Sequence, residues 1–249
     1  MYTEFAQIYD RLMKDVPYAE WARYYADLLE QYGISPGARC VECACGTGSL
    51  TIPLAQLGYR MTGMDLSPEM LNIAQQKARG SGVMIPFIRM DMRKLAVQRP
   101  VDAVLATCDG VNYLSKPEDV AAFFRAAHQA LRPRGVLAFD VSTPYKLVEA
   151  LGDRAFTLSE DDLVYIWQGQ YSHKQKRFEL HMDIFVGGPD RKYLRIQEDQ
   201  CQRAHSQDEL FDALTNTGFS NVHIFGDRVL TPPSQRELRW HVIAQKESE

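Results

Sequence analysis

The sequence VECACGTG, residues 41–48, joins a short apolar segment to a run of small residues. The apolar part predicts a buried strand over 39–44, and the small residues predict a narrow turn that opens onto a helix. Such a turn lets a ligand approach the backbone closely, and the helix N-terminus supplies unpaired N–H groups. Its spacing, acid-x-Ala-x-Gly-x-Gly, differs from the Gly-x-Gly-x-x-Gly fingerprint of dinucleotide sites. The carboxylate of Glu42 would repel a pyrophosphate but attract a cationic amino acid or sulfonium group.

On both sides of this turn, hydrophobic periodicity predicts strands that alternate with helices. A first helix is expected over 19–32, and Ser67 and Pro68 are suited to begin a helix that ends near Gly80. The remaining elements are strands at 59–65, 83–90, 101–107 and 135–141 and helices at 49–58 and 117–131. This alternation predicts βαβ units, and therefore a parallel sheet with right-handed crossovers.

From about residue 154 to 203 apolar and polar residues alternate with a period of two, which predicts antiparallel strands. The expected strands are LVYIWQGQY (163–171), RFELHMDIFV (177–186) and RKYLRIQEDQCQRA (191–204), with a turn at GGPD (187–190). A capped helix at 206–217 and strands at 219–226 and 239–246 close the chain.

These patterns divide the chain into two parts. Residues 1–151 and 204–249 are expected to form the main domain, whose N-terminal helical lid covers about 1–33. Residues 152–203 are expected to form an inserted antiparallel β subdomain that covers the acceptor.

Composition narrows the functional classes. Hydrophobic residues make up 45% and charged residues 24% of the 249 residues, which is typical of a globular protein. The net charge of −4 disfavours a dedicated nucleic-acid binder. No apolar run is long enough to span a membrane and no secretory signal is visible. Together with the odd number of cysteines, 5, this predicts a cytoplasmic protein with free thiols.

Three acidic residues end three successive predicted strands. Glu42 precedes the glycine turn, Asp65 ends the second strand, and Asp91 follows the third. A carboxylate at the position of Asp65 can accept both hydroxyls of a ribose. Asp91 could accept an adenine amino hydrogen while Met92 packs on the ring. Because ligands of doubly wound sheets bind outside the carboxyl ends of the strands, all three acids are expected in one crevice.

This combination resembles the class I S-adenosylmethionine-dependent methyltransferases. VECACGTG resembles their first motif, with Ala44 in place of its first glycine, MTGMDLS resembles the ribose motif, and RMDM resembles the adenine motif. The resemblance covers roughly residues 39–141 plus the closing strands. It implies a doubly wound, mostly parallel seven-stranded α/β sheet, S-adenosylmethionine as cofactor and S-adenosylhomocysteine as product.

A narrower resemblance joins four further segments, FAQIYDRLM, CDGVNYL, FDVSTPYKL and EDQCQRAHS. They are similar to segments of bacterial small methyltransferases that carry an inserted antiparallel sheet and have unassigned substrates. In these enzymes the N-terminal helix folds over the cofactor, and the segment after the fourth strand lines the methyl-transfer site. The cofactor site implied by both resemblances comprises Tyr9, Tyr18, Glu42, Ala44, Cys45, Gly46, Thr47, Gly48, Asp65, Leu66, Met70, Asp91, Met92, Thr107 and Cys108.

Four residues are candidates for catalysis: Asp109, Tyr113, His181 and His205. Either histidine could act as a general base, although a hydrogen-bonded strand histidine is the alternative for each. Asp109 could act as a base or anchor an amine, or could simply form a turn with Gly110. Tyr113 is implied by the resemblance alone.

No metal site is expected. Cys40 and Cys43 should point to opposite faces of a strand, and neither a second cysteine pair nor a nearby histidine follows at zinc spacing. The six histidines show no i, i+3 or i+4 pairs.

The expected reaction is in-line methyl transfer to an oxygen or nitrogen of a small soluble acceptor. The polar face of the insert, with Gln170, His181 and Arg203, is expected to line the acceptor pocket. An RNA-modifying methyltransferase is one alternative, because a basic cluster lies on the insert, although a solvated sheet edge protected by charge is the favoured explanation of this cluster. The cluster comprises Lys174, Lys176, Arg177, Arg191, Lys192 and Arg195. A non-catalytic cofactor-binding module is a second alternative, and a dehydrogenase a weaker third. The pattern indicates neither a membrane partner nor a particular oligomeric state.

Overall fold

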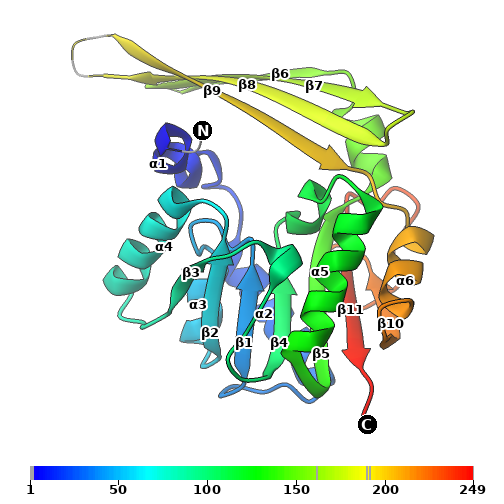
Figure 1. Cartoon of the computed structure of the whole chain (residues 1–249). Helices are drawn as coiled ribbons and strands as arrows, with labels where there is room; N and C mark the ends of the chain where they lie inside the picture. Colours follow the sequence, from blue (N-terminus) through cyan, green and yellow to red (C-terminus); the bar gives the residue numbers. More distant parts are fainter. Residues whose placement is uncertain (1–2, 161, 189, 191, 249) are drawn as a thin grey trace.

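The computed structural model describes residues 3–160, 162–188, 190 and 192–248, which form two β-sheets and the helices around them (Figure 1). The larger sheet has the strand order β10-β11-β5-β4-β1-β2-β3. Its strands are β1 (Arg39–Cys43), β2 (Arg60–Asp65), β3 (Phe87–Arg89), β4 (Val101–Ala106), β5 (Leu131–Ser142), β10 (Phe219–Phe225) and β11 (Arg239–Lys246). The α-helices are α1 (Thr3–Leu12), α2 (Tyr18–Gln31), α3 (Thr51–Gln56), α4 (Pro68–Gly80), α5 (Pro117–Ala130) and α6 (Gln207–Thr215).

The larger sheet is mostly parallel. β1 pairs in parallel with β2 and β4, and β5 pairs in parallel with β4. β11 runs antiparallel to β5, and β10 antiparallel to β11, so the two closing strands form a reversed hairpin at one edge. The predicted doubly wound α/β fold with an additional antiparallel sheet is therefore confirmed.

Residues that alternate along β1 build the core on both faces of this sheet. Val41 and Cys43 pack with buried residues of α5 and α6, whereas Cys40 packs with residues of α2 and α3. The two cysteines therefore lie on opposite faces, as the alternation of side chains along a strand requires.

The second sheet has the order β6-β7-β8-β9, with every pair antiparallel. Its strands are β6 (Ala155–Glu160), β7 (Leu163–Ser172), β8 (Arg177–Gly187) and β9 (Tyr193–Arg203). Figure 1 shows this sheet above α1 and the carboxyl ends of the parallel strands. Its apolar face packs on α1, where Phe5 and Ile8 are 2% and 7% exposed beside Ile184 and Ile196. Each such side chain stabilises the contact by about 1.5–3 kcal/mol.

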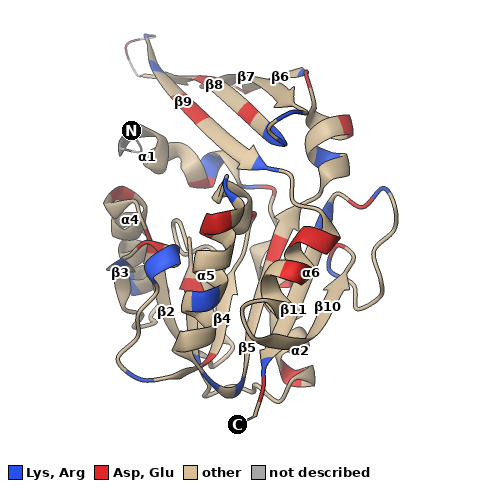
Figure 2. Ribbon diagram, turned by 45° about the vertical axis from the view of Figure 1, so that its right-hand side comes forward, with Lys and Arg blue, Asp and Glu red and all other residues tan. Residues whose placement is uncertain are grey.

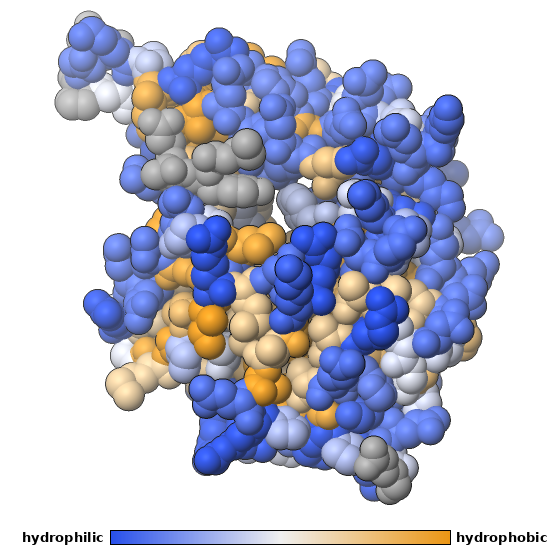
Figure 3. Space-filling model, viewed as in Figure 1, coloured by the Kyte–Doolittle hydropathy of each residue, from blue (hydrophilic) through white to orange (hydrophobic). Residues whose placement is uncertain are grey.

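Hydrophobic surface remains visible near this contact. On the face seen in Figure 3, hydrophilic residues cover most of the molecule, and hydrophobic residues show around the hollow between the two sheets. None of the helices in the described ranges is long and apolar enough to span a bilayer.

Three elements differ from the sequence expectation. The strand expected over 83–90 contains only Phe87–Arg89, because Pro86 has no N–H for the ladder. β6 was not predicted as a separate strand, and α1 precedes the helix expected over 19–32. Arg191 of the predicted basic cluster and Pro189 of the predicted turn lie outside the described residues.

Candidate functional site

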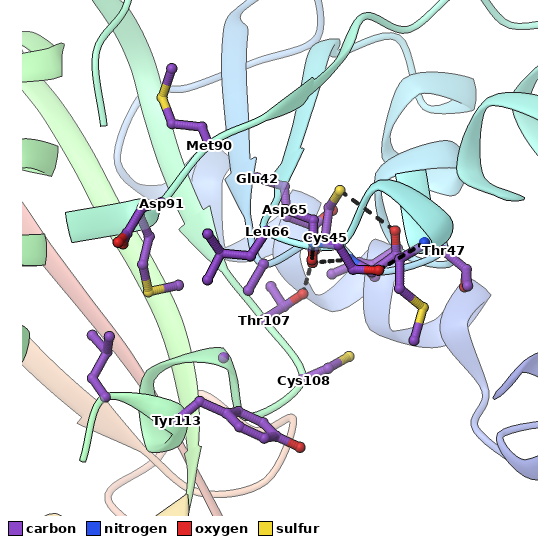
Figure 4. A pocket seen from close by; sticks show the side chains of 18 of the residues that line it. Glu42, Cys45, Thr47, Asp65, Leu66, Met90, Asp91, Thr107, Cys108 and Tyr113 are labelled. Carbon is purple, nitrogen blue, oxygen red and sulfur yellow. Dashed lines mark hydrogen bonds between the residues drawn. The ribbon is translucent and has the colours of Figure 1, made fainter. Parts of the chain in front are cut away.

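A cavity of about 430 Å³ opens at the carboxyl ends of β1, β2 and β4. Figure 4 shows Glu42, Asp65 and Thr107 near its centre, with Asp91 toward one side and Thr47 toward the other. Its lining includes most of the predicted cofactor residues: Tyr9, Tyr18, Glu42, Ala44, Cys45, Gly46, Thr47, Asp65, Leu66, Met70, Asp91, Met92, Thr107 and Cys108. The structure therefore brings these residues together around one space. Gly48 supports the turn and does not line the cavity.

The turn after β1 is a left-handed segment. Ala44, Gly46 and Gly48 have φ values of 52°, 54° and 71°. The N–H of Gly46 donates to Oδ2 of Asp65 over 2.8 Å, and a Cβ on Gly46 would meet no atom within 4 Å. A Cβ on Gly48 would lie 3.2 Å from that of Ala74. Gly46 thus leaves room for a ligand, whereas Gly48 lets the turn pack on α4.

Glu42 lies beneath the turn and is only 2% exposed. Its carboxylate accepts hydrogen bonds from the hydroxyls of Thr51 and Thr107. Burial raises the pKa of Glu42 to about 7, although these two hydrogen bonds oppose the shift. A cationic ligand in the cavity would favour the ionised form of this carboxyl group.

Two further carboxylates stand at the next strand ends. Asp65 accepts the N–H of Gly46 on one oxygen and the N–H of Ser67 on the other, over 2.9 Å, so the backbone fixes its orientation. Asp91 accepts three hydrogen bonds from the Arg93 guanidinium and one from the Arg93 N–H. These bonds lower the pKa of Asp91. Both side chains line the cavity, with orientations that hydrogen bonds fix.

Helix α1 covers the cavity with Phe5 and Tyr9. The carboxylate of Asp10 holds the helix in place: it accepts from Thr47 Oγ1 over 2.6 Å and from Lys77 Nζ over 2.7 Å. The contact of Asp10 with Lys77 could not be predicted from the sequence, because it joins α1 to α4 and local patterns do not encode contacts between helices.

A second cavity, of about 320 Å³, lies beneath the antiparallel sheet. We call it the acceptor chamber, after the acceptor-covering role that the sequence predicts for the inserted sheet. It shares a group of residues with the first cavity: Phe5, Tyr9, Tyr18, Cys108, Tyr113 and Gln200. Its walls are mainly apolar: Leu12, Met13, Val16, Trp21, Leu151, Tyr165, Trp167, Phe178, Leu180, Met182 and Ile184. The two cavities therefore meet at residues shared by α1, β9 and the segment after β4.

Asp109 lies on the floor of the acceptor chamber in an ion-pair network. It pairs with the Arg239 guanidinium, and its second oxygen lies 3.8 Å from Lys146 Nζ. Arg239 also pairs with Asp140, which is fully buried and accepts the N–H groups of Cys108 and Asp109 over 2.8 and 3.0 Å. Burial alone would raise the pKa of Asp109, but Arg239 and Lys146 outweigh it and lower the pKa to about 2. A carboxylate held in this way is a poor proton acceptor.

The structure does not bring His181 to either cavity. Its side chain projects from the outer face of β8, with Nδ1 2.6 Å from Asp199 Oδ1. The hydrogen bond to Asp199 raises the pKa of His181. His181 and Gln170 line a separate depression on that outer face. Gln170 and His181 therefore lie on the face of the sheet opposite to the apolar face that packs on α1.

His205 is buried behind the segment that follows β4. Its Nε2 lies 3.3 Å from the carbonyl oxygen of Val111, and its Nδ1 lies 2.8 Å from Arg203 Nη1. Burial and the Arg203 charge lower the pKa of His205 to about 4. Arg203 is itself 7% exposed and pairs with Glu209. Both side chains are thus engaged in packing away from the cavities.

Tyr113 lies at the junction, where its hydroxyl donates to Gln200 Oε1 over 2.8 Å. In the described part of the chain, no group of His, Cys, Asp and Glu side chains is placed to hold a metal ion.

The cavity at the strand ends has the chemistry that S-adenosylmethionine needs. Gly46 leaves the space beside the backbone open, the fixed carboxylate of Asp65 can accept ribose hydroxyls, and Glu42 can offset a positive charge. The sulfonium supplies an activated methyl group when the cofactor is bound.

Comparisons with known proteins agree with this assignment. Residues 40–135 match a family described as a methyltransferase domain. The chain is 35% identical over 99% of its length, and 97% of the relative, to a Bacillus subtilis protein named "Putative methyltransferase YqeM". A ubiquinone biosynthesis O-methyltransferase of Xanthomonas campestris is 32% identical over 41% of this chain and 42% of its own.

Solved structures share the whole architecture. An S-adenosylmethionine-dependent methyltransferase from Clostridium acetobutylicum superposes with a TM-score of 0.88 at 25% identity, covering 99% of both chains. CalS10 from Micromonospora echinaspora, an amino pentose methyltransferase with S-adenosylmethionine bound, gives a TM-score of 0.76 at 18% identity over 96% of both chains, and it supports the fold alone. The fold, the arrangement of the strand-end residues and the full-length relative agree, and the chain belongs to the class I S-adenosylmethionine-dependent methyltransferases.

Proposed function

We propose that this enzyme methylates a small molecule that binds in the acceptor chamber. The observation that carries the proposal is the junction between the two cavities, where Tyr9, Tyr18 and Cys108 line both. A cofactor in the first cavity and an acceptor in the second would meet there. Positioning and exclusion of water are the main contributions that a protein makes to such a displacement.

Within this proposal each predicted cofactor residue has a role. Asp65 accepts the ribose hydroxyls, and Asp91 accepts the adenine amino group, with Leu66 and Met92 against the ring. Glu42 and the turn 44–48 face the amino-acid part, while α1 closes over the cofactor. These roles are supported by the shared cavity and by the orientation of Asp65.

The comparisons are compatible with a small acceptor. Two structural neighbours are named as an amino pentose methyltransferase and a sugar N-methyltransferase. The five cysteines are unpaired, which favours a reducing compartment such as the cytoplasm.

A chamber-blocking variant tests the proposal. Leu180→Trp should fill the acceptor chamber, abolish methyl transfer to small molecules, and leave S-adenosylmethionine affinity within about twofold. The matched control is His181→Ala, on the opposite face of the same strand, which should keep full activity. Methyl transfer would be followed with labelled S-adenosylmethionine and an extract of bacterial small molecules. Unchanged transfer in Leu180→Trp would contradict acceptor binding in this chamber.

A further inference from the structure

The junction between the two cavities carries only uncharged polar groups. Its polar atoms are the hydroxyls of Tyr9, Tyr18 and Tyr113, the thiol of Cys108 and the amide of Gln200. Burial raises the pKa of Tyr9, Tyr18 and Cys108. Near pH 7 each of these three groups keeps its proton, so none of them can accept the proton of an attacking nucleophile.

The charged groups on the floor of the acceptor chamber are already paired. Asp109 and Asp140 both bind Arg239, and Lys146 donates to Ser142 Oγ over 2.8 Å beside Asp109. Two carboxylates and two cations cancel one another. The described residues of the floor therefore offer neither an unpaired carboxylate that could act as a base nor a net charge that would balance a charged acceptor.

Apart from the amide of Gln202 and the hydroxyl of Tyr165, the rest of the chamber is apolar. Trp167, Phe178 and Met182 from the antiparallel sheet line it together with Val16 and Trp21. An acceptor that carried a full charge into this space would lose hydration without gaining an unpaired counter-charge. The walls thus select an uncharged molecule with an apolar body.

We propose that the methyl acceptor is a neutral primary or secondary amine on an apolar body, so that the enzyme is an N-methyltransferase. This inference rests on the proposed function. The nitrogen lone pair forms the bond to the methyl carbon, the carbon–sulfur bond breaks, and its electron pair goes to sulfur. The methylated ammonium passes its proton to water. A neutral amine attacks with its own lone pair and needs no base, whereas an alcohol or phenol must lose a proton first.

The desolvated chamber also favours the reactive form of an amine. Transfer from water into an apolar space disfavours the ammonium and lowers its pKa. The same transfer raises the pKa of a carboxylic acid, and no unpaired cation on the floor would keep it ionised, so a carboxylate acceptor would lose its nucleophilic form. An amine is therefore the nucleophile that these walls and this floor suit best.

Three probes that share one body test the inference: 3-phenylpropylamine, 3-phenylpropanol and 3-phenylpropanoate. Each is incubated with the full-length enzyme and labelled S-adenosylmethionine, and an extract of bacterial small molecules is treated in parallel. We expect label on nitrogen in the extract products, and turnover of the amine at least 100-fold faster than that of the other two. Faster labelling of the alcohol or carboxylate, or label on oxygen, sulfur or carbon in the extract, would overturn the inference while leaving the proposed function intact.

The pH profile provides a second readout. Below the pKa of the amine, kcat/KM should rise about tenfold per pH unit, and the profile should shift to lower pH with the less basic 2,2-difluoro-3-phenylpropylamine. A profile that stays fixed when the amine is changed would show that a group of the enzyme provides the base, against the inference. If S-adenosylmethionine binds but neither a probe nor the extract is labelled, the proposed function itself fails.

Discussion

Individual residues of the turn after β1 differ in what they tolerate. Ala44 occupies a left-handed position, φ 52°, at the place of the first glycine in the motif that this turn resembles. Left-handed backbone costs a non-glycine residue about 1–2 kcal/mol, so the turn retains this conformation under strain. Gly46 and Gly48 adopt the same region without that cost.

Substitution of Gly46 separates ligand binding from stability. Gly46→Ala should destabilise the protein by about 1 kcal/mol, because alanine is strained in the left-handed region. It should also weaken the binding of S-adenosylmethionine at least tenfold, because the new Cβ enters the cavity. Gly33 provides the control, since it also has a positive φ, 75°, and an open surrounding. Gly33→Ala should cost similar stability and leave the affinity unchanged. Calorimetric titration and thermal unfolding measure the two effects, and equal affinity losses in both variants would argue against the cofactor site.

Glu42 should make cofactor binding depend on pH. Burial raises its pKa to about 7 in the free protein, and a cationic ligand favours the carboxylate. Affinity for S-adenosylmethionine should therefore improve by up to about tenfold per pH unit below pH 7 and level off above it. Glu42→Gln should remove this contribution. The affinity of both proteins for S-adenosylmethionine would be measured by titration from pH 5.5 to 8.5, and the comparison between them cancels the ionisation of the ligand itself. If the affinity of both proteins changed equally with pH, the role of Glu42 would be refuted.

At the scale of the element, the antiparallel sheet presents two different faces. Along β8, Leu180 and Met182 face the acceptor chamber, whereas His181 projects from the opposite face. The same alternation places Glu198 of β9 on the buried side, where it is 2% exposed and its carboxylate has no hydrogen-bond partner among the described residues. The contact between this sheet and α1 therefore includes a buried acid.

This buried acid should make stability depend on pH. Burial raises the pKa of Glu198 to about 7, so the folded state favours the protonated acid. The resulting stability is fully present below the unfolded pKa of about 4.3 and is lost as pH rises toward 7. Glu198→Gln should consequently stabilise the protein at pH 8, by about 1 kcal/mol or more, and have little effect at pH 4.5.

Denaturant unfolding at several pH values would measure this difference. Glu179→Gln is the matched control, because Glu179 is exposed on the neighbouring strand. If the free energies of unfolding of Glu198→Gln and of the unchanged protein differed by the same amount at every pH, the argument would be contradicted.

At the scale of the whole molecule, charge is mixed and not segregated. Figure 2 shows acidic and basic residues interspersed over both sheets and the helices. Within the predicted basic cluster, Lys176 pairs with Glu209, Lys192 with Asp190 and Arg195 with Asp183. Neighbouring acids thus offset much of the cluster, which favours a solvated sheet edge over a phosphate-binding surface.

RNA binding should accordingly be weak. We expect no complex with transfer RNA at 10 μM protein and roughly 0.15 M salt, measured by filter binding. Micromolar affinity that falls steeply with salt, and that is lost in a Lys174→Ala, Lys176→Ala double variant, would instead support the RNA-modifying alternative.

The sequence could predict which residues line the cavity at the strand ends, because its signals are local. The turn 41–48 and the acids Asp65 and Asp91 each sit at a strand end that periodicity reveals, and topology then brings the ends together. The acceptor side depends on how the antiparallel sheet packs. Alternation separates its two faces but does not say which one meets α1, and in the structure Trp167 lines the cavity beneath the sheet while Gln170 and His181 line the outer face.

Helix α1 has a consequence for the order of events in turnover. Phe5 and Tyr9 belong to the walls of both cavities. The helix is tied to the parallel sheet side through Asp10 and Lys77 and to the antiparallel sheet through the Arg11–Asp162 pair. Any displacement of α1 therefore alters both compartments at once. If the cofactor occupies the first cavity and the acceptor the second, as proposed, cofactor exchange and release of the methylated product are linked through this one helix.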